Sequence, residues 1–184
     1  YRDAGLTLFR SETFFSLTGN KGEERASYTY NYKNNGSDVR STTILDYETT
    51  GAREEQRLVK SDTYEGEVAD ILNLGAETIL STTYNFIASA AIEPGDEIAD
   101  YSHDYRTGRD TYFYYGTIEG IDGVRADTAD IDDQLVRSVV YRDAGLTLFR
   151  SETFFSLTGN KGEERASYTY NYKNNGVDVR STTI

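Results

Sequence analysis

Hydrophobic and polar residues alternate over short stretches of this chain. The clearest alternation is at residues 27–32, where tyrosines occupy the even positions and Ser, Thr and Asn the odd ones, so that three rings share one face of an extended strand. Related stretches lie at residues 10–14, 25–28, 40–44, 60–64, 80–84, 99–101, 110–112 and 137–141. Short strands at such regular spacing, separated by turn residues, predict an all-β, mainly antiparallel chain.

The pattern also repeats on a longer scale. Residues 141–184 match residues 1–44 at every position except one, where Val177 replaces Ser37. Self-similarity at a fixed period indicates a repeat architecture. We therefore interpret residues 1–140 as one full tandem repeat of arbitrary phase and residues 141–184 as the start of the next, with about eight strands per 140-residue repeat. The two blocks are expected to fold alike, and position 37 to be exposed because it accepts both Ser and Val.

Tight connections between the predicted strands share an aromatic–spacer–glycine signature. It occurs at residues 32–36, 47–51, 105–108 and 141–145. Glycine supplies the positive φ that such turns need, and Asn35-Gly36 predicts a type I′ hairpin turn.

Residues 130–140 allow two interpretations. Their apolar residues are at near-helical spacing behind an Asp-rich start, which suits a capped helix. The register of the related stretches favours a strand over residues 135–141 instead, and we predict the strand.

The aromatic–spacer–glycine signature is followed, after a few residues, by Arg or Ser, then Thr and an aromatic residue. This unit resembles the YD repeat of RHS and teneurin-type proteins. The closest stretch is residues 104–109, Asp-Tyr-Arg-Thr-Gly-Arg, beside the Tyr-Asp-x-x-Gly-Arg of that family. In all four turns a residue other than Asp follows the tyrosine. The resemblance implies a long antiparallel β-ribbon. Together with the long period it leads us to expect a repetitive, solenoid-like array of ribbon.

Composition excludes some kinds of chemistry and indicates a cellular location. The chain has 16 Tyr and 8 Phe but no Cys, which excludes disulfides, a zinc knot and a cysteine nucleophile. Nothing in it resembles a signal peptide, and no apolar run has the roughly 18 residues of a transmembrane segment. A cysteine-free, acidic, Tyr- and Thr-rich repeat is the composition we expect of an extracellular or cell-surface protein.

Charge is distributed unevenly over the net −12 of the chain. Each copy of the repeated block has a net charge of +1, so residues 45–140 hold 7 of the 19 basic and 21 of the 31 acidic residues, a net of −14. Nucleic acid is not expected as a partner, because a duplex-binding surface needs the opposite sign. The acidity either keeps a large assembly soluble or binds divalent cations.

Five aspartates crowd one predicted loop and are the candidate metal ligands: Asp122, Asp127, Asp130, Asp132 and Asp133. Calcium takes six to eight oxygen ligands, and alternate acidic positions in a loop can supply them. The spacing is not that of an EF-hand. A solvated acidic turn is the favoured interpretation, calcium is the alternative, and no other cofactor is expected.

Catalysis is not expected. His103, the one histidine, lies between Ser102 and Asp104 in a predicted strand. Neighbours in a strand point to opposite faces, so these three residues cannot form a catalytic triad. An enzyme acting on polysaccharide would need paired carboxylates in a cleft, and no such pair is singled out.

The sequence therefore predicts a non-enzymatic structural segment of an extracellular fibre or long cell-surface protein. Its partners would be neighbouring repeats, stacked through β-strands into a homopolymeric or fibrous assembly. The alternative is a bead-like β-sandwich repeat of an adhesin stalk that binds glycan or protein. Five basic residues hold equivalent places in the strand pattern and are expected near strand starts, close to acidic side chains: Arg10, Arg25, Arg40, Lys60 and Arg137.

Overall fold

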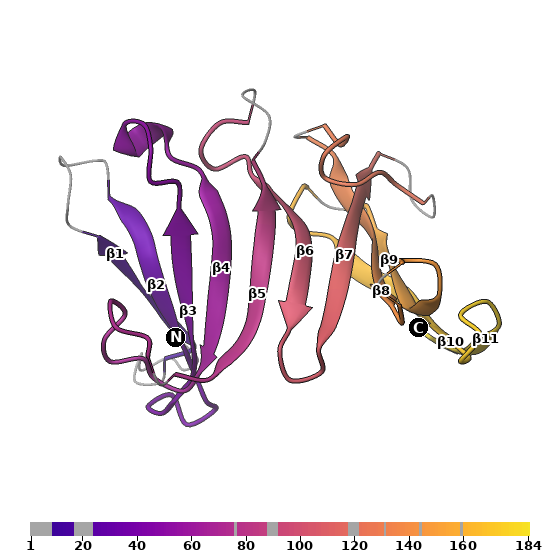
Figure 1. The fold of residues 1–184 in the computed structure, drawn as a ribbon, viewed down its shortest axis with the longest axis horizontal. Coiled ribbons are helices and arrows are strands. Elements are labelled where there is room, and N and C mark those ends of the chain that lie inside the picture. Colours follow the sequence, from indigo (N-terminus) through magenta and orange to yellow (C-terminus); the bar gives the residue numbers. More distant parts are fainter. Residues whose placement is uncertain are drawn as a thin grey trace. The chain divides into compact units, whose positions relative to one another are not determined.

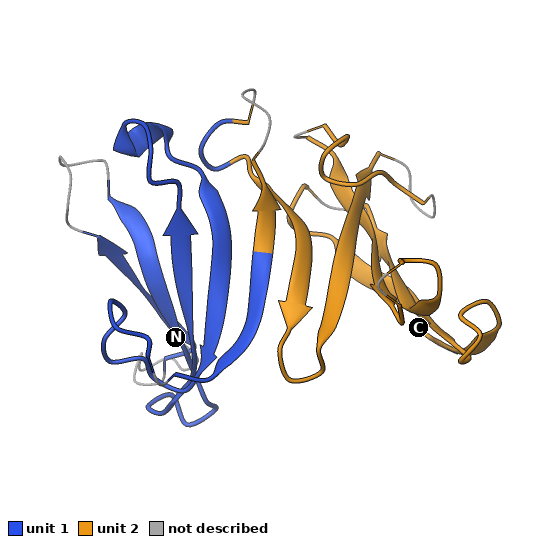
Figure 2. Ribbon diagram, in the orientation of Figure 1, with its two compact units in different colours: residues 1–83, 93–95 blue, residues 84–92, 96–184 orange. Residues whose placement is uncertain are grey.

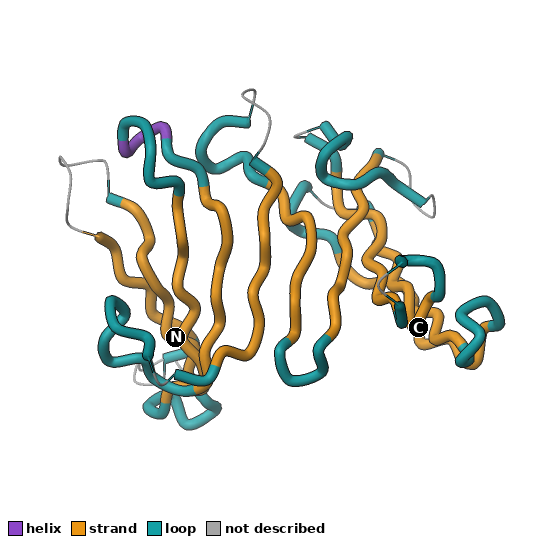
Figure 3. The backbone as a smooth tube through the Cα atoms, in the orientation of Figure 1, coloured by secondary structure: helices purple, strands orange, loops and turns teal. Residues whose placement is uncertain are grey.

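The computed structural model describes residues 9–16, 24–75, 77–87, 92–117, 122–130, 132–143, 145–158 and 160–184. Within them the chain forms strands and one short 3-10 helix, η1 (Arg53–Glu55) (Figure 1; Figure 3). The strands are β1 (Ser11–Ser16), β2 (Arg25–Tyr32), β3 (Val39–Tyr47), β4 (Leu58–Glu65), β5 (Ile79–Phe86), β6 (Ile98–Asp104), β7 (Arg109–Gly116), β8 (Gln134–Tyr141), β9 (Phe149–Ser156), β10 (Arg165–Tyr172) and β11 (Val179–Thr183). The all-β prediction is confirmed, and each predicted stretch overlaps a strand.

The chain forms two compact units, one of residues 1–83 with 93–95 and one of residues 84–92 with 96–184 (Figure 2). Within the first unit β1 to β4 pair in chain order, and within the second unit β6 to β11 pair in chain order. Such an order needs only hairpin connections, which agrees with the turn residues between the predicted strands.

Residues 134–141 form a strand and not the helix that their spacing also allowed. Val139 of β8 lies opposite Tyr112 of β7 on one side and opposite Glu152 of β9 on the other. The side chains of Val136 and Val139 are fully buried. Pairing on both edges satisfies the backbone donors and acceptors of β8, and burial on the sheet outweighs its near-helical spacing.

Bulges recur where the aromatic residue of the turn signature ends a strand. Tyr32, Tyr141 and Tyr172 each lie opposite the first residue of the next strand, and the residue after that one has no partner in the ladder. These unpaired residues are Arg40, Arg150 and Arg180. A bulge of this kind bends the strand and re-aims the side chain at the extra position.

The turn at Asn35-Gly36 is present, but the type I′ prediction is wrong. A type I′ turn needs positive φ at both central residues, whereas Gly36 has a φ of 71° and Asn35 is not left-handed. The Gly36 N–H donates to the Lys33 carbonyl at 2.9 Å. The Asn35 side-chain oxygen accepts the N–H groups of Ser37 and Asp38 at 3.2 and 3.1 Å. That local hydrogen bonding by Asn holds a wider loop.

In the turn that follows Tyr141, the residue with positive φ is Leu146, at 54°. Gly145, the glycine of the turn signature, does not have positive φ. The Asp143 carboxylate accepts the N–H groups of Thr147 and Leu148 at 3.1 and 2.8 Å. These bonds hold the turn in a conformation that an L-residue rarely adopts.

In the first unit the interior is organised around Thr42, which is fully buried together with Val68. The Thr42 hydroxyl donates to the Gly66 carbonyl at 2.8 Å and accepts the Val68 N–H at 3.0 Å. The Tyr30 hydroxyl donates to the Val68 carbonyl at 3.0 Å. Loop 66–68 is thereby held against the sheet by polar groups that satisfy one another.

In the second unit the buried centre consists of Ile98, Tyr115 and Ala126, with Phe86, Phe113, Ala129 and Leu135 packed around it. The Tyr115 hydroxyl donates to the Ala99 carbonyl at 2.6 Å. Burial raises the pKa of Tyr115, so the side chain remains a neutral donor.

Where the structure describes both copies of the repeated block, their first two strands pair in the same register, although β9 begins at Phe149 and β1 only at Ser11, the counterpart of Ser151. Ser11 to Ser16 pair with Asn31 to Arg25, and Ser151 to Ser156 pair with Asn171 to Arg165, with the same register shift. Phe14 stacks on Tyr28 with ring centroids 4.6 Å apart, and the copies of these rings are 4.8 Å apart. Ser37 and Val177 are both exposed, as predicted.

Candidate assembly interface at the period junction

The junction between the two periods lies inside a hairpin. Residues 140 and 141 are both in β8, which pairs antiparallel with β9 from Arg137↔Phe154 to Tyr141↔Phe149. β8 therefore carries the end of one period and β9 the beginning of the next. Both strands belong to the second unit.

A buried ion pair joins the two periods across this hairpin. Arg137 Nη1 lies 2.8 Å from Glu152 Oε1, and the two residues are only 8% and 5% exposed. The same Nη1 lies 3.0 Å from Asp122 Oδ1. The Arg137 guanidinium also sits over the Tyr114 ring, 4.3 Å from its centroid. A buried charge needs such compensation, because desolvation of an unpaired ion is costly.

Tyrosine hydroxyls complete the polar cluster. The Tyr172 hydroxyl donates to Glu152 Oε2, and the Tyr114 and Tyr141 hydroxyls are 2.8 Å apart. Burial, then the hydrogen bond to Glu152, raises the pKa of Tyr172. Burial, then the hydrogen bond with Tyr114, raises the pKa of Tyr141. Both groups therefore stay neutral donors through the physiological pH range.

The first copy of the block contains the same glutamate and tyrosine, but there the glutamate is not buried by a neighbouring strand. Glu12, the counterpart of Glu152, accepts the Tyr32 hydroxyl at 2.9 Å but is half-buried. In the sheet order β1 has β2 as its neighbour, whereas β9 lies between β8 and β10. Pairing with β8 is therefore what buries Glu152.

At the other end of the repeat, β3 and its copy β11 differ in burial. Thr42 of β3 is fully buried, while its counterpart Thr182 of β11 is exposed. β3 lies between β2 and β4, whereas β11 follows β10 at the end of the sheet order. Both outer strands thus carry side chains that their inner copies bury against a neighbouring strand.

The predicted row of basic residues is partly confirmed. Lys60 forms ion pairs with Asp62 at 2.7 Å and with Asp46 at 3.9 Å, and Arg137 pairs as described. Arg25, at the start of β2, instead reaches the side-chain oxygen of Gln56 at 3.4 Å. Its guanidinium also lies 5.1 Å from the centroid of the Tyr47 ring.

Three of the five candidate calcium ligands have partners within the protein. Asp122 pairs with Arg137. Asp133 Oδ2 accepts the Asp130 N–H at 2.9 Å, and Asp130 Oδ1 accepts the Asp132 N–H at 3.3 Å. Asp127 is exposed. In the part of the chain that the structure describes, no three acidic or histidine side chains converge as a metal site. Calcium binding by this loop stays a prediction.

His103 lies opposite Asp110 of β7. Its Nδ1 is 2.7 Å from Asp110 Oδ1, and its ring meets that of Tyr105 edge-on at 4.5 Å. The contact is a cross-strand polar pair at the end of the β6–β7 hairpin.

The sequence pattern predicts a role for Arg137 but does not identify Glu152 as its partner. Glu12 and Glu152 stand two residues before Phe14 and Phe154, on the strand face that carries the packed rings. A carboxylate on an otherwise apolar strand face is the signal that could have pointed to a buried partner.

Comparison of the chain with family models, with curated proteins and with solved structures found no match. Among the described residues, no helix is long and apolar enough to cross a membrane.

Proposed function

We propose that this chain is a structural repeat segment of an extracellular fibre or long cell-surface protein. In this proposal successive 140-residue periods stack through β-strands, each new period pairing its first strand with the last strand of the one before. The buried Arg137–Glu152 pair carries the proposal, since it joins two periods inside one hairpin.

Both outer strands support the same assembly. A preceding period would place its counterpart of β8 against β1 and bring an arginine to Glu12. A following stretch would place its counterpart of β4 against β11 and cover Thr182. Each contact already exists once in the chain, at β8–β9 and at β3–β4. Continued pairing of this kind leaves few free strand edges.

The resemblance to YD-repeat ribbons belongs to this proposal. Within each unit the paired strands follow one another in sequence, as in a ribbon. Bead-like sandwich repeats would need a linker once per period, whereas β8 to β11 pair consecutively from one period into the next. The cysteine-free, acidic composition supports an extracellular location, which antibody labelling of intact cells would test.

Arrays lengthened by one, two and three further periods test the proposal. In a stacked ribbon each junction adds an interface, so the melting temperature should rise with the number of periods and approach a limit. Negative-stain microscopy should show continuous filaments. A melting temperature independent of period number, with beads separated by linkers in the images, would support the adhesin-stalk alternative instead.

A further inference from the structure

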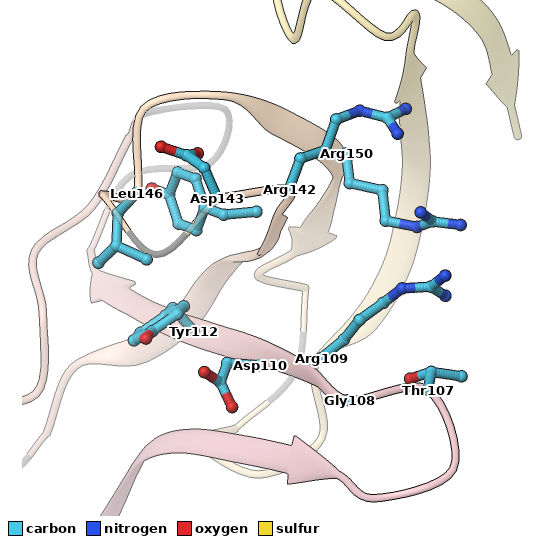
Figure 4. Close-up of a pocket in the computed structure, with 10 residues that line it drawn as sticks. Thr107, Gly108, Arg109, Asp110, Tyr112, Arg142, Asp143, Leu146 and Arg150 are labelled. Carbon is cyan, nitrogen blue, oxygen red and sulfur yellow. The ribbon is translucent and has the colours of Figure 1, made fainter.

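A cavity of about 410 Å³ lies on the second unit, beside the same period junction (Figure 4). Three arginines line it, Arg109 at the start of β7, Arg142 just after β8, and Arg150 in β9. Their side chains extend to the same side of the cavity in Figure 4. Three arginines around one cavity are unexpected in a chain of net charge −12.

Among the residues that the structure describes, these three arginines form no ion pair. The two carboxylates that line the same cavity are engaged elsewhere. Asp110 holds His103 at 2.7 Å, and Asp143 accepts the N–H groups of its own turn.

The fold positions two of these arginines. Arg150 is the unpaired residue of the β8–β9 bulge, which re-aims its side chain. Arg142 Nη2 donates to the Tyr172 carbonyl at 2.9 Å. Burial, then repulsion by the positive charges of Arg109 and Arg142, lowers the pKa of Arg150. An anion would relieve that repulsion.

We propose that the cavity lined by Arg109, Arg142 and Arg150 binds a phosphate or sulfate group. Guanidinium groups present forked N–H donors that match the oxygens of such tetrahedral anions. The anion would come either as the free ion or as an ester carried on a sugar.

The site is built from two periods. Arg109 belongs to one, and Arg142 and Arg150 to the next, where they are the counterparts of Arg2 and Arg10. The first block has no counterpart of Arg109 before it in this chain, so the 184 residues should hold one such site. The count of sites in longer arrays rests on the proposed function, with one site per junction, whereas the site itself does not.

Titration of the full chain with inorganic phosphate, inorganic sulfate and glucosamine 6-sulfate, at constant ionic strength, tests the proposal. The readouts are calorimetric binding and the NMR shifts of the arginine Nε–H groups. Arg150→Gln should weaken binding by roughly tenfold or more, the loss expected for one charge-assisted contact. Arg10→Gln, the same change in an identical local sequence, should leave binding unchanged. Tighter binding of the sugar ester than of free sulfate would identify an esterified ligand, and equal binding the free ion.

Phosphate and sulfate stabilise proteins in general. The melting temperature with and without anion, compared between wild type and Arg150→Gln, controls for this effect. Without anion, Arg150→Gln should melt at a higher temperature than wild type because repulsion is relieved. With anion, that advantage should shrink or reverse. The proposal is overturned if no probe binds with one-to-one stoichiometry, or if Arg10→Gln and Arg150→Gln weaken binding equally.

Discussion

Arg137 and Glu152 form a buried ion pair, Nη1 to Oε1 at 2.8 Å, between strands that belong to different periods of the repeat. The copy of Glu152 in the first block, Glu12, has the same neighbours in sequence but is half-buried. The pair therefore depends on the junction and not on the local sequence. It provides a matched comparison within one chain.

Glu152→Gln should lower the free energy of unfolding by about 3 kcal/mol, because it leaves the buried Arg137 with only the exposed carboxylate of Asp122. Glu12→Gln should lower it by about 0.5 kcal/mol or less, as expected of a site without a buried ion pair. Urea unfolding of both variants, at unchanged m-value, measures the difference. Equal losses of unfolding free energy in the two variants would mean that the Arg137–Glu152 pair adds nothing to the hydrogen bond that each glutamate accepts from a tyrosine.

Gly176→Ala should be more damaging than Gly162→Ala. Both glycines have positive φ, 69° and 86°, so alanine at either position carries about 1–2 kcal/mol of backbone strain. At Gly176 the new Cβ would also lie 2.7 Å from the Cα of Leu148, whereas at Gly162 it would meet nothing within 4 Å. Backbone cannot move aside cheaply, so Gly176→Ala should cost about 1–3 kcal/mol more. Thermal unfolding of the two variants tests this order.

Glu48 should make the stability depend on acid pH. Hydrogen bonds from the Arg57 side chain and backbone lower the pKa of Glu48 from 4.5 to about 2. A group with a lowered pKa stabilises the fold fully above its unfolded pKa, and that stabilisation is lost as pH falls through the folded pKa. The difference in melting temperature between wild type and Glu48→Gln should therefore be constant above about pH 5 and shrink between pH 4.5 and 2. Glu54→Gln, at an exposed position in η1, is the control. A constant difference down to pH 2 would contradict the prediction.

The loop that contains Asp130 and Asp133 should be indifferent to calcium if it is a solvated acidic turn. Its carboxylates accept N–H groups of the turn itself, and solvent screens their mutual repulsion. The melting temperature should be the same in chelator and in millimolar calcium. A rise with calcium that Asp133→Asn removes would establish the alternative, a calcium site.

The strands could be predicted from the sequence because their determinants are local. Alternation of rings and small polar residues over residues 27–32 places them on opposite faces of a strand wherever the strand lies. Glycines such as Gly36 allow the positive φ that ends a hairpin. Near-identity of the two blocks also determined that they would share one register. These inferences needed no knowledge of which strands become neighbours.

Tertiary structure alone decided the burial of Glu152, its pairing with Arg137 and the meeting of Arg109 with Arg150. Glu12 and Glu152 have the same local sequence, and pairing with β8 distinguishes them. The bulges shift the register by one residue, and a shift of one residue exchanges the faces of a strand. Side chains from separate strands therefore converge only after pairing has set the register, which the pattern along a single strand does not contain.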